Sequence, residues 1–114
     1  MVDTPDAPAA PPEAVHVISD AASGLEGVIV LHSTRRGAAA GGCRLWRYAD
    51  RASLTADALR LAEGMAYKNA LADLPLGGGK AVLDLPDRAV DRHRLFAAFG
   101  RAVAQLDGAY VTAE

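Results

Sequence analysis

The spacing of apolar residues predicts alternating strands and helices. Short runs rich in β-branched residues predict strands at 15–18, 27–33, 44–46, 81–85 and from 110 onward. Residues 35–42 are expected to form a loop. Apolar residues at three- and four-residue steps predict a long helix over about 53–71, carried by Leu54, Ala58, Leu61, Ala62 and Met65. A second helix is predicted over about 91–106, with Gly108 as its C-terminal cap and with one face formed by Leu95, Phe99, Ala102, Val103 and Leu106. Strands that alternate with helices indicate an α/β layer architecture.

The first fourteen residues differ in composition from the rest. Four prolines, at positions 5, 8, 11 and 12, lie among alanines and acidic residues. This composition predicts a flexible arm over 1–14, because it offers too little apolar surface to bury. A signal peptide would need basic residues followed by an apolar stretch. The remaining residues, 15–114, are enough for one domain with a modest core.

Charge and composition exclude several functional classes. The formal net charge is −2, aromatic residues make up 5% of the chain, and no basic run occurs, so we expect no nucleic-acid surface. No segment is long and apolar enough to suggest a membrane span. Cys43 is the only cysteine, which prevents an internal disulfide and favours a reducing, cytoplasmic location. The three histidines lack metal-ligand spacing, so no metal site is expected.

The two lysines are the most unusual charged residues. Twelve residues are lysine or arginine, and only Lys68 and Lys80 are lysines. Arginine stays charged at any working pH, whereas a lysine amine can lose its proton in a dry site or beside another cation. Both lysines lie in glycine-bearing segments, Gly64–Ala70 and Gly77–Ala81. Two residues are a small sample, so the composition alone does not exclude that the lysines lie in these two segments by chance.

The residues between the lysines allow the two amines to meet. Pro75 disfavours a continued helix, and the three glycines at 77–79 permit backbone angles closed to other residues. The end of the first helix can therefore fold back against the next strand. In a shared pocket, one amine would pair with a ligand carboxylate and the other would act as a base. The alternative is that Lys68 is a solvated helix-end residue and Lys80 an exposed turn residue.

A phosphate-binding loop is a competing reading of Gly77–Lys80. That motif needs a glycine six residues before the lysine and a serine or threonine after it. Here those positions hold Leu74 and Ala81. The sequence therefore disfavours a phosphate loop.

Four segments carry a resemblance to a known family. They are Ala40-Gly41-Gly42-Cys43-Arg44, Gly64-Met65-Ala66-Tyr67-Lys68-Asn69-Ala70, Leu76-Gly77-Gly78-Gly79-Lys80-Ala81-Val82 and Tyr110-Val111-Thr112-Ala113-Glu114. In order and spacing, residues 15–114 resemble the N-terminal domain of the leucine/phenylalanine/valine branch of the glutamate dehydrogenase-like amino-acid dehydrogenases. The resemblance implies a three-layer-like α/β substrate domain with a mixed sheet and flanking helices, which also carries subunit contacts. A Rossmann-type domain would follow it.

The resemblance also implies an activity and the residues that perform it. The family deaminates an L-amino acid oxidatively and reversibly to its 2-oxo acid and ammonia, usually with NAD. Lys68 matches the lysine that holds the substrate carboxylate. Lys80 matches the catalytic lysine, which activates the water that attacks the imine. Gly41, Gly42 and Met65 match residues that line the amino-acid pocket. The resemblance thus implies a small-molecule substrate, a homo-oligomer, and NAD held by a C-terminal domain.

Two departures from the family pattern bear on these expectations. Glutamate enzymes have a lysine immediately before the glycine pair, where this chain has Ala40, so an apolar substrate of the leucine, valine or phenylalanine type is expected. The family pattern also continues beyond Glu114 with an acid/base aspartate, and no Gly-x-Gly-x-x-Gly fingerprint occurs in the chain. We therefore expect a fragment that is inactive alone. A non-catalytic amino-acid-binding or oligomerisation module stays open, as do the preferred amino acid, NAD against NADP, and the oligomeric state.

Overall fold

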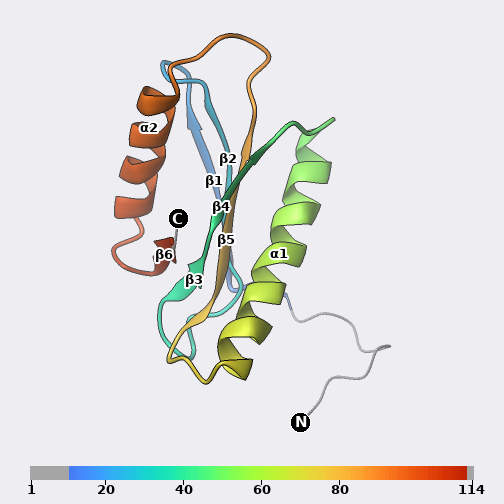
Figure 1. Ribbon diagram of the computed structural model, residues 1–114, viewed down its shortest axis with the longest axis vertical. Helices are drawn as coiled ribbons and strands as arrows, with labels where there is room; N and C mark the ends of the chain where they lie inside the picture. The colour runs from blue at the N-terminus through green and yellow to red at the C-terminus, as the bar shows by residue number, and fades with distance from the viewer. Residues whose placement is uncertain (1–10, 113–114) are drawn as a thin grey trace.

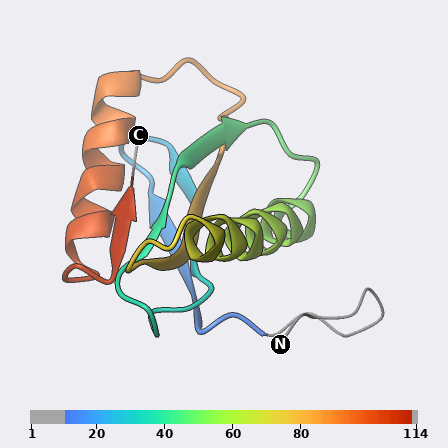
Figure 2. The same cartoon turned by 60° about the horizontal axis from the view of Figure 1, so that its bottom comes forward.

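Two helices cover opposite faces of one sheet, so the domain has three layers (Figures 1 and 2). The computed structural model describes residues 11–112. Within them the elements are β1 (Ala14–Asp20), β2 (Leu25–Leu31), β3 (Ala39–Gly41), β4 (Cys43–Trp46), α1 (Arg51–Leu71), β5 (Gly77–Asp84), α2 (Arg92–Ala104) and β6 (Tyr110–Thr112). Ten residues at the N-terminus, most of the predicted arm, lie outside the described residues, as do 113 and 114.

The sheet is mixed, as the family resemblance implies. Its order is β1-β2-β5-β3-β6, and β4 lies beside β5 off this path. β1 pairs with β2, and β2 with β5, in antiparallel fashion. β5 pairs in parallel with both β3 and β4, and β3 pairs in parallel with β6. The strand β5 is therefore central, and it carries Lys80.

The core consists of two apolar clusters, one on each face of the sheet. The cluster on the α1 face joins Val28, Val30 and Val82 of the sheet to Leu54, Ala58 and Ala62 of the helix. The cluster on the α2 face contains Leu25, Ile29, Leu31, Ala39, Ala81, Leu83, Leu95, Ala98, Phe99 and Tyr110. Strands whose residues alternate between these clusters bury both faces, which explains their almost continuous apolar sequence.

The apolar pattern predicted most elements correctly, with three differences. Ala39–Gly41 forms the short strand β3 inside the predicted loop. The glycines at 77–79 belong to β5, which begins four residues earlier than predicted. Helix α2 ends at Ala104, and Gly108 lies in the following turn with φ of 85°. The two strand differences involve small residues, whose pairing depends on neighbouring strands rather than on a local apolar pattern. The helix ends earlier because residues 105–109 form a turn, in which the N–H groups of Leu106, Asp107 and Ala109 donate to carbonyls three residues before them.

Candidate functional site

The glycine pair lies at an interruption between β3 and β4. β3 pairs with Gly77 and Gly78, and pairing resumes where Cys43 lies opposite Ala81. Gly41 and Gly42 bridge this interval beside Gly79 and Lys80, and the Ala81 N–H donates to the Gly42 carbonyl at 3.1 Å. Gly41 and Gly42, two of the predicted pocket residues, therefore lie beside the part of β5 that carries Lys80, the predicted catalytic lysine.

Backbone and helix approach each other closely at Gly41. A Cβ added there would overlap the Gly79 carbonyl oxygen and lie 3.2 Å from Cγ of Met65. Only glycine therefore fits between β5 and α1 at this position. The structure brings Gly41, Gly79 and Met65 together, although they come from three different elements.

The side chain of Lys80 lies on the α1 face of the sheet. Side chains two residues apart in a strand share a face. Gly78 faces Ala66 of α1, and Val82 belongs to the cluster on the α1 face. Lys80 lies between them, half-buried, and pairs with Val30 of the same cluster. It is a strand residue facing a helix, not an exposed turn residue.

Lys68 lies in the last turn of α1, one turn after Met65. It is exposed, and its positive charge suits the negative end of the helix dipole. The chain then turns back, as the proline and glycines predict, because Asn69 donates from Nδ2 to the Gly77 carbonyl of β5 at 2.8 Å. Lys68 therefore lies near the start of β5, at the same end of α1 as Met65.

Neither lysine amine forms an ion pair with a carboxylate of residues 11–112. The ion pairs of this part of the chain all use arginine, at positions 36, 44, 47, 51 and 60. Lysines without a carboxylate partner on the domain remain able to bind an acidic ligand.

The positive charge of Lys80 affects the pKa of the nearby Cys43 thiol. Burial raises the pKa of the Cys43 thiol to about 11, and the positive charge of Lys80 opposes that effect. The thiol is therefore held in its neutral form at physiological pH. The Cys43 side chain packs against the cluster on the α2 face, whereas the Lys80 side chain lies on the α1 face.

Two buried polar residues at the site carried no predicted role. Asn69 is 6% exposed, and its Nδ2 donates to the Ala40 carbonyl at 3.3 Å as well as to Gly77. Tyr110 is 2% exposed, and its hydroxyl contacts the carbonyl oxygens of Gly41 and Gly42 at 3.0 and 2.9 Å. A signal for Asn69 exists in the sequence, since it lies four residues after Met65 on the apolar stripe.

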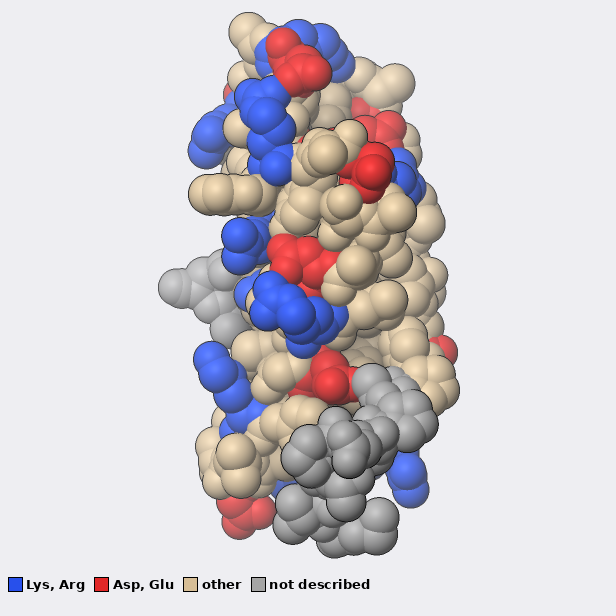
Figure 3. Space-filling view, turned by 90° about the vertical axis from the view of Figure 1, so that its right-hand side faces the viewer, with Lys and Arg blue, Asp and Glu red and all other residues tan. Residues whose placement is uncertain are grey.

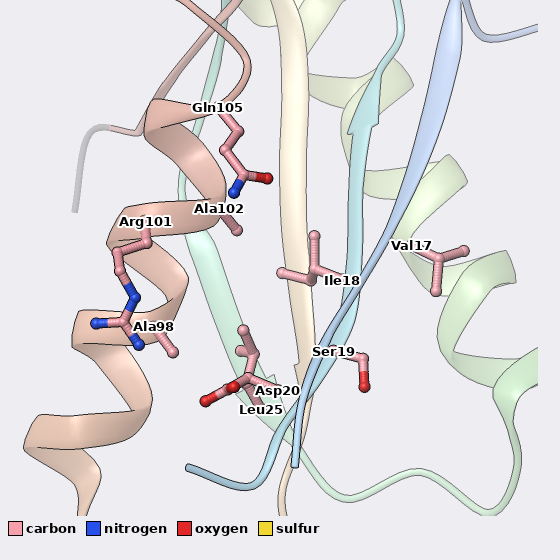
Figure 4. Close-up of a pocket in the computed structure, with 9 residues that line it drawn as sticks. All are labelled: Val17, Ile18, Ser19, Asp20, Leu25, Ala98, Arg101, Ala102 and Gln105. Carbon is pink, nitrogen blue, oxygen red and sulfur yellow. The ribbon is translucent and has the colours of Figure 1, made fainter. Parts of the chain in front are cut away.

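Another concave surface of residues 11–112 lies away from the predicted site residues. An open hollow lies between β1 and α2, where Asp20, Arg101 and Gln105 contribute polar atoms (Figure 4). None of the five predicted site residues lines it. The face that carries α1 shows basic and acidic side chains interleaved (Figure 3). Among residues 11–112, no group of three or more His, Cys, Asp or Glu is placed to hold a metal ion, and no helix could cross a membrane.

Comparison with known proteins gives a consistent result. The family model described as Glu/Leu/Phe/Val dehydrogenase, dimerisation domain, matches residues 12–114. Valine dehydrogenase of Streptomyces albus is 52% identical over 101 residues, which are 89% of this chain and 28% of the relative. Leucine dehydrogenase of Bacillus subtilis is 48% identical over 95 residues, 83% of this chain and 26% of the relative. The chain thus spans little more than a quarter of these relatives.

The solved structures with a similar fold are also amino-acid dehydrogenases. L-tryptophan dehydrogenase from Nostoc punctiforme superposes with a TM-score of 0.82 at 35% identity, over 90% of this chain and 30% of that one. Glutamate dehydrogenase from Thermus thermophilus superposes with a TM-score of 0.70 at 22% identity, over 89% of this chain and 26% of that one, which supports the fold alone.

Proposed function

This chain belongs to the Glu/Leu/Phe/Val dehydrogenase family, and from that premise we propose that it is the substrate domain of an NAD-dependent L-amino-acid dehydrogenase. The full-length protein would convert an apolar amino acid reversibly to its 2-oxo acid and ammonia. The observation that carries this proposal is the placement of Lys80 and Met65 beside the glycine pair, with both lysine amines free of carboxylate partners within residues 11–112.

The two lysines would have different roles. Lys68, exposed at the end of α1, binds the substrate carboxylate through a charge-assisted hydrogen bond. Lys80 is held in a strand and faces α1, which fixes its direction better than a surface position would. It takes a proton from the water as the water oxygen bonds to the imine carbon, and it returns that proton to the amine nitrogen. The C–N bond then breaks, ammonia leaves, and the added hydroxyl loses its proton to become the 2-oxo group. Gly41, Gly42 and Met65 form the wall against which the amino acid lies.

NAD, the hydride acceptor, does not fit the glycine run of this chain. Gly77–Gly79 is buried within β5, and a side-chain atom at Gly78 would already overlap α1. A phosphate cradle needs free N–H groups around an open concavity. The cofactor therefore belongs to a part of the protein outside residues 11–112. The family resemblance implies NAD, and we therefore propose NAD as the hydride acceptor of the full-length protein.

An apolar substrate is supported by Ala40 and by the relatives. Ala40 is 7% exposed and uncharged, so it offers nothing to neutralise a second substrate carboxylate. Dehydrogenases for valine, leucine and tryptophan are among the similar proteins. The match to a dimerisation domain supports assembly into a homo-oligomer. The cytoplasmic location expected from the single cysteine stays a prediction.

A substrate panel on the full-length protein tests the proposal. We expect NADH formation with valine, leucine or phenylalanine, and little with glutamate. Lys68→Ala should raise KM for the amino acid about 100-fold, because it removes a charged contact worth about 3 kcal/mol. Arg60→Ala, which removes another exposed cation of α1, is the matched control and should leave KM unchanged. No NADH formation with any amino acid would instead favour a non-catalytic module.

A further inference from the structure

Three successive carbonyl groups of the glycine segment are held by two buried side chains. The Asn69 amide donates to Ala40 at 3.3 Å, and the Tyr110 hydroxyl contacts Gly41 and Gly42 at 3.0 and 2.9 Å. A hydroxyl has one proton, so the two glycine carbonyls share it. We call Asn69 and Tyr110 the carbonyl clamp.

The carbonyl clamp contacts β5 as well as the glycine segment, and its two side chains come from opposite faces of the sheet. Asn69 reaches from α1, and its amide also donates to Gly77 of β5 at 2.8 Å. Tyr110 belongs to the cluster on the α2 face. Its ring lies against Gly79, where an added Cβ would be 3.0 Å from Cδ1 of the tyrosine. The residue after Gly79 is Lys80, so the ring supports the strand directly before the proposed base.

The segment needs such support because its own residues supply little. Glycine has more backbone freedom than any other residue, and here two glycines follow one another at the end of β3, with Gly42 alone connecting β3 to β4. Hydrogen bonds to the carbonyls restrict that freedom. The Tyr110 hydroxyl gives the buried Gly41 a side-chain partner, and it adds a second partner at the Gly42 carbonyl, which already accepts from the Ala81 N–H. A hydroxyl placed at these two carbonyls therefore fixes the glycine backbone relative to Lys80.

We propose that Tyr110, assisted by Asn69, is a positioning residue for amino-acid binding. Resting on the proposed function, this inference assigns Tyr110 the role of holding the Gly41–Gly42 wall at the distance from Lys80 that the substrate requires. Tyr110 contacts neither substrate nor cofactor in this role. It acts through the two glycine carbonyls.

Replacing Tyr110 with phenylalanine tests the proposal, because the ring stays and only the hydroxyl is removed. In the full-length protein, Tyr110→Phe should raise KM for the amino acid about tenfold and leave KM for NAD within about twofold. Hydrogen exchange in the segment 39–43 should accelerate in the variant. Tyr48→Phe is the matched control, since it also removes a bonded hydroxyl, the partner of Asp57 away from the glycines. It should change neither KM nor the exchange of that segment beyond any general loss of stability.

Two results would overturn the clamp. One is parent-like KM and parent-like exchange in Tyr110→Phe. The other is a parallel loss of activity in both tyrosine variants that follows their melting temperatures, which would make Tyr110 a stabilising residue only. An inactive parent protein would refute the proposed function, and the exchange comparison would then decide the clamp separately.

Discussion

Replacing Gly78 with alanine tests how closely α1 lies on β5. A Cβ at this position would lie 2.5 Å from the Ala66 Cβ and nearer still to the backbone N and Cα of Ala66. Carbon atoms normally approach to about 3.5 Å, so helix and strand must separate by about 1 Å. None of the three atoms belongs to a flexible side-chain end, so the backbone itself has to move.

The cost follows from this displacement. Forcing one extra carbon into a packed interior costs about 1–3 kcal/mol. We expect about 2 kcal/mol or more, because the separation also loosens the cluster formed by Val30, Val82 and Ala62. Small proteins lose about 1–3 kcal/mol of stability per molar urea. The urea midpoint of Gly78→Ala should therefore fall by about 1 M.

Gly64→Ala is the matched control on the same helix. Nothing lies within 4 Å of a Cβ added there, and the residue is exposed in the middle of α1. Alanine in a helix is more favourable than glycine by about 1 kcal/mol, so this variant should unfold at higher urea than the parent chain. Far-UV circular dichroism of the three chains in urea measures both shifts. A Gly78→Ala midpoint equal to or above that of the parent would refute the close packing of α1 on β5.

Two further predictions concern titratable groups. A hydrogen bond from Tyr48, and then the Arg60 and Arg44 guanidinium groups, hold the pKa of Asp57 below its usual value. The ionised Asp57 carboxylate should therefore stabilise the fold fully above about pH 4, and this stabilisation should vanish as pH falls through the lowered pKa. Asp57→Asn should therefore be less stable than the parent at pH 7 by about 1 kcal/mol, and this difference should shrink as pH falls below about 4. A difference that stays constant as pH falls would contradict this. Burial raises the pKa of the Cys43 thiol to about 11. At pH 8 the thiol should therefore react with iodoacetamide about 100-fold more slowly in the folded chain than in the urea-unfolded chain. Equal rates in the two states would show that the thiol is not buried.

The long periodic elements were predictable because their patterns are local. The stripe from Leu54 to Met65 predicted α1 to within about two residues of its start, and the structure buries Leu54, Ala58 and Ala62 as expected. The glycines at 77–79 were harder to interpret. Glycine has no strand preference of its own, and these residues form strand because β2 and β3 pair with them and α1 lies against Gly78.

The site was predictable only in part, for a similar reason. The composition singled out Lys68 and Lys80, and the family resemblance added Gly41, Gly42 and Met65. Contacts of Asn69 and Tyr110 with main-chain carbonyls depend on residues 8 to 69 positions away in sequence. No local sequence pattern encodes such contacts. The carbonyl clamp therefore follows only from the tertiary structure, which places these segments beside one another.

Kinetics of Lys80→Ala in the full-length protein test the central claim most directly. Removing a positioned base typically lowers turnover by a factor of about 10²–10⁴, and the loss should appear in kcat for NADH formation from the preferred apolar amino acid. Binding of the same amino acid, measured by calorimetry, should stay within about threefold of the parent, because Lys68 and the glycine wall remain. Parent-like NADH formation by Lys80→Ala would falsify the assignment of Lys80 as the catalytic base.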